Sequence, residues 1–164
     1  IEKFIPARKG KKHVMQILDS IISFEPKSKT TNLNTTLIQA SQILKKRSML
    51  FIVSDFFDSS DYSEPLKILR RKHDIILLKI VDLREQEIPQ VGLIELEDKE
   101  TGEQTLVDTS NPVFLKNYKQ AISNNELQFV STLGKLKLDS IKILTDENYE
   151  LPLRKFFKRR IRGK

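Results

Sequence analysis

The sequence predicts an α/β fold, in which helices cover both faces of a mostly parallel sheet. Two short runs support it, "MLFIV" at residues 49–53 and "DIILLKIV" at Asp74–Val81, both rich in strand-favouring residues. Hydrophobicity that is continuous along a strand indicates burial on both faces, as in a parallel sheet. A helical pattern at residues 63–72 separates the two runs. Strand, helix and strand joined by short connections predict a right-handed βαβ unit.

The elements before the first strand are two helices. Residues 11–24 carry apolar side chains at helical spacing, which predicts a helix with one buried stripe formed by Val14, Ile17, Leu18, Ile21 and Ile22. Residues 33–44 predict a second helix, whose first turn Thr31 or Asn32 is placed to cap. Ser63 is placed in the same way to cap the helix between the two strands.

The elements after the second strand complete the pattern. Residues 92–98 and 103–109 flank a turn that contains Gly102, and they predict a short antiparallel hairpin. A long helix is expected to begin at Asn111-Pro112 and to end at Gly134. Residues 139–145 predict a last strand, which a basic terminal helix follows.

Composition narrows the chemistry. The 164 residues include no cysteine, so disulfides and thiolate metal sites are excluded, and the presence of only two histidines disfavours a histidine-rich zinc site. The length suits one domain. No apolar run approaches the roughly 20 residues that a membrane-spanning helix needs, and no signal peptide is visible. We therefore expect a cytoplasmic protein.

The formal net charge of +7 is concentrated at the end of the sequence. Residues 154–164 hold seven of the 29 Lys and Arg and no acid, which leaves 22 basic residues against 22 acids elsewhere. Such a tail suits contact with nucleic acid or an acidic membrane surface. It also suits a terminal helix that packs down while its charges stay in solvent, through Leu151, Phe156, Phe157 and Ile161. We favour the helix, because no aromatic and basic platform elsewhere extends a nucleic-acid surface.

Polar residues fall at the carboxyl edge of the predicted sheet, where ligands of open parallel sheets bind. Asp55 follows the first strand, Asp82 follows the second, and Thr31 and Asn32 lie in the loop before the second helix. Hydroxyl and carboxylate oxygens suit Mg²⁺ or Ca²⁺ rather than zinc. Carboxylates at strand ends also commonly form turns or cap helices. Spacing alone leaves both interpretations open.

Longer segments of the sequence give a more specific signal than these single residues. "TNLNTTL" at 31–37 and "FIVSDF" at 51–56 resemble the second and third metal-site segments of a von Willebrand factor type A domain. The resemblance is closer to the bacterial domain-of-unknown-function family 58, which carries such a domain. The phrases "IEKFIPARKGKKHV", "RRKHDIILLKIVDLREQEIPQVGLIELEDKETGE" and "LTDENYELPLRKFFKRR" match its pattern in order, over essentially the whole chain.

The resemblance implies a Rossmann-like sheet with a metal-ion-dependent adhesion site at its carboxyl edge. Thr31 would match the threonine of that site and Asp55 its late aspartate, with Mg²⁺, Mn²⁺ or Ca²⁺ as the ion. The family's first site segment, Asp-x-Ser-x-Ser, is absent from this sequence, as are the strands that precede it. We therefore expect residues 1–164 to be the C-terminal portion of a single type A-like domain. Coordination left mostly to water would make metal binding weak or absent in this chain.

The absent strands have a second consequence. The strand from Met49 to Val53 would become an exposed apolar edge, and such edges pair with other chains. We expect self-association through this edge, or non-native packing of it. The resemblance also leaves room for membrane association through the missing N-terminal part.

The leading functional hypothesis is a non-enzymatic protein-interaction module, in which a partner's carboxylate fills an open position on the metal. The resemblance implies a MoxR-type AAA+ ATPase as a partner in chaperone-like assembly or remodelling of a carboxylate-bearing client. We expect no catalytic residue and no small-molecule substrate. One alternative is a Mg²⁺-dependent phosphoryl-transfer enzyme or nuclease built on Asp55 and Asp82. The other is nucleic-acid binding through residues 154–164.

Overall fold

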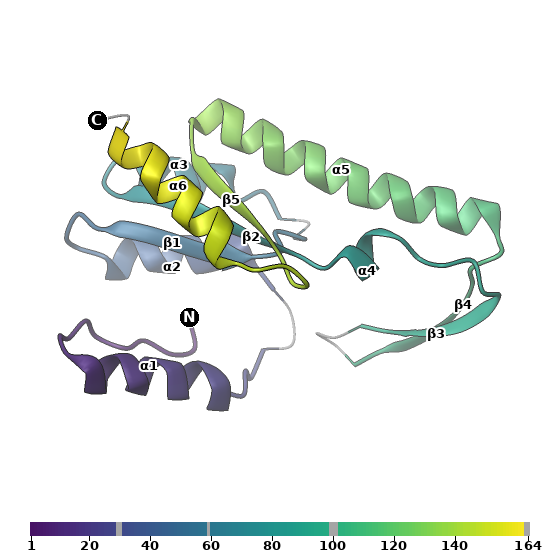
Figure 1. The fold of residues 1–164 in the computed structure, drawn as a ribbon, viewed down its shortest axis with the longest axis horizontal. Coiled ribbons are helices and arrows are strands. Elements are labelled where there is room, and N and C mark those ends of the chain that lie inside the picture. The colour runs from purple at the N-terminus through teal and green to yellow at the C-terminus, as the bar shows by residue number, and fades with distance from the viewer. Residues whose placement is uncertain (29–30, 59, 99–101, 163–164) are drawn as a thin grey trace.

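A parallel sheet forms the centre of the protein (Figure 1). The computed structural model describes residues 1–28, 31–58, 60–98 and 102–162. Within them, Met49–Ser54 (β1), Asp74–Val81 (β2) and Asp139–Leu144 (β5) pair in the order β1-β2-β5, all parallel. Leu93–Glu97 (β3) and Gln104–Asp108 (β4) form a separate antiparallel pair. The predicted α/β class, with its parallel sheet and its hairpin, is confirmed. The turn residues 99–101 lie outside the described part.

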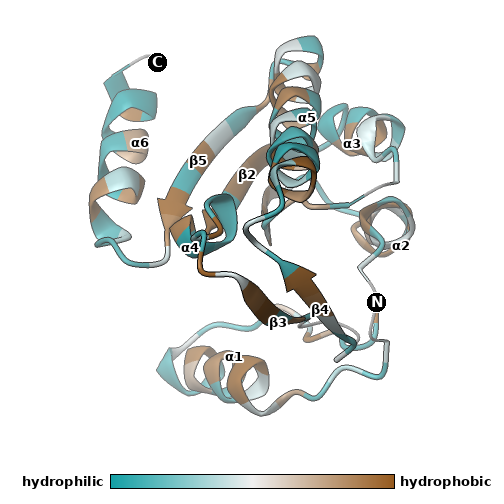
Figure 2. Ribbon diagram, turned by 90° about the vertical axis from the view of Figure 1, so that its right-hand side faces the viewer, coloured by the Kyte–Doolittle hydropathy of each residue, from teal (hydrophilic) through white to brown (hydrophobic). Residues whose placement is uncertain are grey.

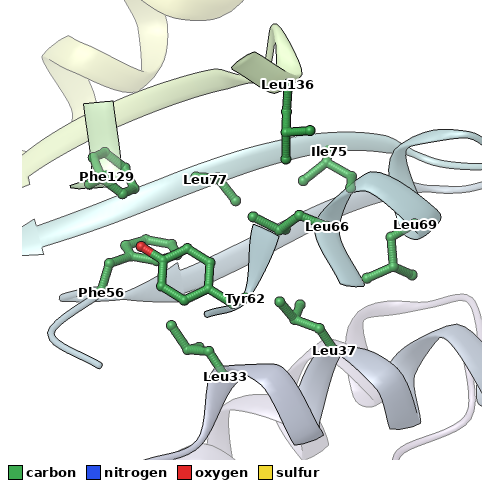
Figure 3. Packing of buried hydrophobic residues seen from close by; sticks show 10 residues of the cluster. All are labelled: Leu33, Leu37, Phe56, Tyr62, Leu66, Leu69, Ile75, Leu77, Phe129 and Leu136. Atoms are coloured by element: carbon green, nitrogen blue, oxygen red, sulfur yellow. The ribbon is translucent and has the colours of Figure 1, made fainter. Parts of the chain in front are cut away.

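Helices cover both faces of the sheet, as the sequence predicts (Figure 2). Leu33–Ile43 (α2), Ser63–Arg70 (α3) and Pro112–Leu136 (α5) lie over one face, and Glu150–Arg162 (α6) lies over the other. Neighbouring residues of a strand point to opposite faces. The larger core cluster therefore takes Ile75 and Leu77 of β2 (Figure 3), and the smaller one takes Ile76. β2 is buried on both faces, as predicted.

β1 differs from the prediction that both of its faces are buried. Leu50 and Ile52 pack against the larger core cluster. Met49 and Val53, on the other face, are 51% and 62% exposed. In the described chain β1 pairs with β2 alone, and the Phe51 ring lies 6.2 Å from that of Phe157 on α6, centroid to centroid. Continuous hydrophobicity was a poor guide here, because β1 is an edge strand that α6 only partly covers.

Lys11–Ser23 (α1) is a helix, as predicted, but its apolar stripe is not buried. Val14, Leu18 and Ile22 are all exposed, and His13 is the helix's buried residue. Figures 1 and 2 show α1 set apart from the parallel sheet and from the helices that cover that sheet. Spacing predicted the helix correctly, but it could not say whether another element covers the stripe.

Polar side chains decide where several helices begin. The Asn32 side chain accepts a hydrogen bond from the amide of Thr35 at 2.8 Å, which confirms the predicted cap of α2. The prediction of Ser63 as the cap of α3 was wrong. Ser63 is the first helical residue, and its amide donates to the Asp61 carboxylate at 2.9 Å.

The long helix α5 begins where the sequence predicts and ends later. The Asn111 side chain accepts from the amides of Val113 and Phe114. The helix continues past Gly134 to Leu136, because Leu136 belongs to the larger core cluster. Lys137 then ends the helix in the left-handed conformation, with φ of 46°.

The basic tail forms a helix, as expected, but few of its apolar residues pack down. Phe156 is buried in the smaller core cluster. Leu151 and Ile161 are 56% and 77% exposed, and Phe157 is 37% exposed. Residues 163 and 164 lie outside the described part. Packing of α6 therefore depends on Phe156, on the partly buried Leu153 and on the ion pairs of Arg160 described below.

Candidate functional site

A cleft of about 380 Å³ opens at the carboxyl edge of the parallel sheet, beside α5. Asp55 and Asp82 both line it, as their positions after β1 and β2 predict. Lys79, Asn125 and Glu126 line it as well. The parallel strands thus bring two of the predicted site residues to one cleft.

Asp55 is displayed on a tight turn directly after β1. Its side chain is exposed, and one carboxylate oxygen accepts from the amide of Phe57 at 3.1 Å. The Ser54 hydroxyl donates to the same oxygen at 3.3 Å and accepts from the amide of Phe56 at 3.0 Å. The position of Asp55 is therefore fixed by its own neighbours, while part of its carboxylate faces solvent.

Phe56 anchors this turn. Its φ is 56°, a left-handed backbone that costs free energy for a residue with a Cβ. Its ring is 1% exposed and lies 4.9 Å from the ring of Phe129 on α5, centroid to centroid. The Phe56 carbonyl accepts from the Asn125 side chain at 2.8 Å. Burial of the ring and the bond to α5 hold the strained backbone in place.

Three aspartates, spaced three residues apart, shape the loop after β1. Asp55, Asp58 and Asp61 each accept a hydrogen bond from the amide two residues further on, at 3.1, 2.7 and 2.9 Å. This is the geometry of an Asx turn. The sequence signal was present in "DFFDSSDYS", where an acid recurs every third residue. Sequence analysis identified Asp55 but missed the roles of Asp58 and Asp61.

Asp58 joins this loop to the start of α2. Its second carboxylate oxygen accepts from the amide of Leu33 at 2.6 Å. Partial burial acts to raise the pKa of Asp58, but the hydrogen bonds from the amides of Leu33 and Ser60 outweigh it and lower that pKa. Asp58, two residues beyond the segment 51–56, therefore links the loop after β1 to the segment 31–37, whereas Asp55 makes no such bond in the described structure.

Thr31 lies elsewhere. It lines a hollow of about 720 Å³ between the N-terminal segment and α2, together with Glu2 and Ser20, whereas Asp55 lines the cleft beside α5. The donor chemistry of Thr31 and Asp55 fits Mg²⁺, Mn²⁺ or Ca²⁺, which all prefer oxygen ligands. Mg²⁺ nevertheless needs about six ligands. Metal binding by Thr31 and Asp55 stays a prediction.

Asp82 is engaged in its own loop. It caps the short helix Leu83–Gln86 (α4) through the amide of Arg84, and its other oxygen lies 3.1 Å from the Arg84 guanidinium. The Arg84 side-chain hydrogen bond is the main cause of the lowered pKa of Asp82. Asp82 therefore helps to form a turn and caps a helix. This is one of the two interpretations that spacing alone had left open.

Lys79 is a buried charge that sequence analysis missed. Its Nζ lies 2.6 Å from a carboxylate oxygen of Glu126 and 4.5 Å from the centre of the Phe129 ring. The Lys79 side chain is 8% exposed. The only signal was a lysine inside the otherwise apolar run "ILLKIV". The pair links β2 to α5 across the cleft.

Comparison with known proteins places the chain in a family. Residues 1–128 match the family described as "Protein of unknown function DUF58". The chain belongs to this family. No solved structure matches the chain.

Mycobacterial proteins are among the relatives of this DUF58 chain. It is 25% identical over 162 residues to "Uncharacterized protein MAV169" of Mycobacterium avium, covering 95% of that protein. It is 23% identical over 163 residues to "Uncharacterized protein Mb1516" of Mycobacterium bovis and "Uncharacterized protein Rv1480" of Mycobacterium tuberculosis. The alignment covers 97% of this chain but 50% of each of these two relatives, so the chain spans about half of their length.

Two kinds of feature are absent from the part of the chain that the structure describes. Residues 1–28, 31–58, 60–98 and 102–162 contain no group of three or more His, Cys, Asp or Glu side chains that could hold a metal ion. Among the helices of the same residues, none combines the length and the apolar character required to cross a bilayer.

Proposed function

We propose that this chain is a non-enzymatic protein-interaction module of the von Willebrand factor type A kind, which binds its partner at the carboxyl edge of the sheet. The observation that carries the proposal is Asp55, an exposed carboxylate held on a rigid turn at the mouth of an open cleft. Asp55 would contribute an oxygen ligand to a divalent cation, and Thr31, which lines a different hollow, would have to supply a second one from the loop before α2. Such a cation would supply a positive charge that a partner's carboxylate can bind.

The arrangement of Asp55 suits recognition. Its turn is fixed by the buried Phe56 ring and by Asn125, so the carboxylate needs little reorganisation when a partner arrives. The Rossmann-like identity of the sheet is part of the proposal, and so is the view that the chain is the C-terminal portion of a type A-like domain. A MoxR-type AAA+ ATPase is the partner that we propose, in assembly or remodelling of a carboxylate-bearing client.

A metal titration tests the role of Asp55. Isothermal calorimetry with Mn²⁺ on the full-length protein should show binding to the wild type, and Asp55→Asn should lose it, because an amide is a weaker ligand that still accepts from the Phe57 amide. Asp82→Asn is the matched control, since it also removes one carboxylate from the cleft. Equal loss in both variants, or undiminished binding in Asp55→Asn, would contradict the proposed ligand.

A partner experiment tests the function itself. A MoxR-type ATPase from the same organism, immobilised on a surface, should retain the wild-type protein in the presence of Mg²⁺ and release it with a chelator. The Asp55→Asn variant should not be retained, whereas Asp82→Asn should be. Retention that ignores both the chelator and Asp55 would place the contact elsewhere on the molecule.

The enzyme alternative rests on one observation, which is that Asp55 and Asp82 line the same cleft. Two carboxylates on neighbouring strand ends can hold a catalytic Mg²⁺. The pairing of Asp82 with Arg84 weighs against it, because both oxygens of that carboxylate already accept hydrogen bonds from Arg84. Assays of Mg²⁺-dependent hydrolysis with nucleotide and nucleic-acid substrates separate the alternatives. Turnover that disappears in both Asp55→Asn and Asp82→Asn would favour the enzyme.

A further inference from the structure

The opposite edge of the parallel sheet, at the amino ends of its strands, gathers basic residues. The helix end or loop that precedes each strand contributes some of them: Lys45, Lys46 and Arg47 before β1, Arg70, Arg71 and Lys72 before β2, and Lys135 and Lys137 before β5. The C-terminal end of α6 reaches the same edge, because Arg160 pairs with the first residues of β2 and β5. Charge that looked like a property of the tail is therefore continuous with charge from the body of the chain.

A hollow of about 400 Å³ lies within this edge. Arg47, Arg70, Lys137 and Arg160 line it, with His73. Among the described residues, Arg47, Arg70 and Lys137 have no ion-pair partner. The acids that line it, Asp74 and Asp139, both bind Arg160. The lining therefore carries a formal net charge of about +2, from four cations against two carboxylates.

His73 adds a buried polar group to the wall of the hollow. The residue is 4% exposed, and its Nδ1 has no hydrogen-bond partner in the described structure. Its backbone is fixed, since its amide donates to the Leu69 carbonyl at 2.8 Å. Buried polar atoms are rarely left without a partner, because each loses its bonds to water. Because Nδ1 itself is covered, an oxygen-rich ligand in the hollow would supply the missing acceptor to an Nδ1–H group once the ring turns toward it.

Arg160 gives the hollow a rigid side. Its guanidinium lies 2.7 Å from a carboxylate oxygen of Asp74 and 3.2 Å from one of Asp139. These bonds tie α6 to the starts of two neighbouring strands. The positive groups around the hollow therefore come from four places along the chain: the loop before β1, the end of α3, the end of α5, and α6.

We propose that this hollow is a binding site for a phosphate group. The ligand chemistry follows from the lining: several cationic donors around a space of small-molecule size match the oxygens of a tetrahedral dianion, which arginine recognises in particular. The site is separate from the Asp55 cleft, since it lies at the other end of the strands. The phosphate group comes either from a free phosphate or phosphorylated small molecule, or from a nucleic-acid backbone.

Inorganic phosphate is the first probe. In ¹H–¹⁵N NMR spectra of the protein in a phosphate-free buffer, added phosphate should produce saturable shift changes at His73 and Lys137. Arg47→Ala/Arg70→Ala should weaken the binding about tenfold or more, since a hydrogen bond to a charged group contributes roughly 1.5–3 kcal/mol. Both side chains are exposed, so this double variant should fold.

The matched control is Lys116→Ala/Lys119→Ala, which removes the same charge from exposed positions on α5. It should bind phosphate as the wild type does. Equal weakening in both double variants would overturn the proposal, because it would show attraction by net charge alone. Shift changes that never saturate, or that miss His73 and Lys137, would also overturn it.

Variants of His73 test the buried group. His73→Asn keeps a nitrogen donor near the position of Nδ1, and His73→Leu removes it. Among variants whose circular dichroism matches the wild type, phosphate binding should be weakened in His73→Leu and largely restored in His73→Asn. Equal affinity in the two variants would show that His73 does not touch the ligand, and the site as proposed would be wrong.

A short DNA duplex distinguishes the two sources of phosphate. Duplex that displaces inorganic phosphate from His73, with an affinity that falls steeply with salt, would identify a nucleic-acid backbone. Duplex that leaves the phosphate shifts unchanged would identify a free or small-molecule phosphate. Equal binding of the duplex to Arg47→Ala/Arg70→Ala and to Lys116→Ala/Lys119→Ala would show that the duplex attaches elsewhere. That result would count against a nucleic-acid source of the phosphate at this site.

Discussion

The two edges of the parallel sheet carry opposite charge and hold it in different ways. At the carboxyl edge, Asp55, Asp58, Asp61 and Asp82 each accept a hydrogen bond from the amide two residues further on. At the amino edge, Arg160 binds both nearby acids, and the cations around it in the hollow keep no ion-pair partner in the described chain. The acids shape their own loops, whereas the bases are left facing solvent.

This difference teaches that the number of charges at an edge does not measure how many are free to bind a ligand. An acidic cluster after a strand resembles a metal site in sequence, yet most of its oxygens can be engaged by amides a few residues away. A lysine or arginine side chain cannot accept a hydrogen bond from a backbone N–H, because it has donors only. Basic clusters at loop positions are therefore more often free for an external partner.

The largest effect is expected where the carboxyl edge depends on one side chain. Phe56→Ala should lower the free energy of unfolding by about 3–5 kcal/mol, because it removes a fully buried ring from the core. Urea unfolding measures it. Phe57→Ala is the control, since that neighbouring ring is 60% exposed, and it should change stability by less than about 0.5 kcal/mol. Similar losses in both variants would show that the ring of Phe56 is not the anchor.

A smaller effect is expected where ion pairs hold the amino edge. Arg160→Ala should cost about 1–2 kcal/mol, because solvent screens pairs whose acids, Asp74 and Asp139, are more than a third exposed. Lys158→Ala, on an exposed position of the same helix, should cost almost nothing. Adding 1 M NaCl should reduce the difference between the two variants, since salt screens such pairs. A difference that salt does not change would point to lost packing instead.

Asp58 tests whether the acids of the carboxyl edge act as loop formers. Its pKa is lowered in the folded protein, so the ionised form stabilises the fold. This contribution is complete above the unfolded pKa of about 4 and is lost as the pH falls through the lower folded pKa. Asp58→Asn should therefore cost about 1 kcal/mol at pH 7, similar to the loss of a side-chain acceptor at a helix start, and less at pH 3.

Unfolding of wild type and Asp58→Asn at both pH values measures this effect. Glu64→Gln serves as the control, because Glu64 is an exposed acid on α3 whose pair with Lys67 is also solvent-exposed. It should change stability little at either pH. A cost for Asp58→Asn that is the same at pH 3 and pH 7 would show that charge plays no part in the bond to Leu33.

The smallest effect on stability is expected at the open side of the sheet, next to β1. We predict that the wild-type protein self-associates there, because the strand presents an unpaired edge and the exposed Val53 in the described structure. Val53→Lys should shift sedimentation velocity profiles toward monomer while changing stability by less than about 0.5 kcal/mol. A wild-type protein that is monomeric at every concentration would exclude this association.

The sequence predicted the elements well because periodicity and capping are local. β2, the hairpin and the cap at Asn32 all appear where the pattern places them. Burial was harder, since it depends on what lies across from an element. The stripe of α1 and the outer face of β1 meet too little of the chain to be covered, and no pattern within them shows this.

The candidate site was predictable in part for the same reason. The parallel sheet brought Asp55 and Asp82 to one cleft, as strand direction requires. Lys79, Glu126 and Asn125 reach that cleft from segments far apart in the sequence, so spacing could not connect them. The basic amino edge was missed because its charges are spread over separate loops, among which the acids of the sequence are interspersed.

At Lys137, the backbone conformation favours glycine whereas the proposed phosphate site uses a lysine. The residue ends α5 with φ of 46°, a conformation in which glycine is favoured, yet its side chain lines the basic hollow. Lys137→Gly should therefore make the protein more stable and a poorer binder of phosphate. The lysine would then persist at this position through selection for binding, at the expense of stability. Engineering that optimises thermal stability alone would be expected to replace it first.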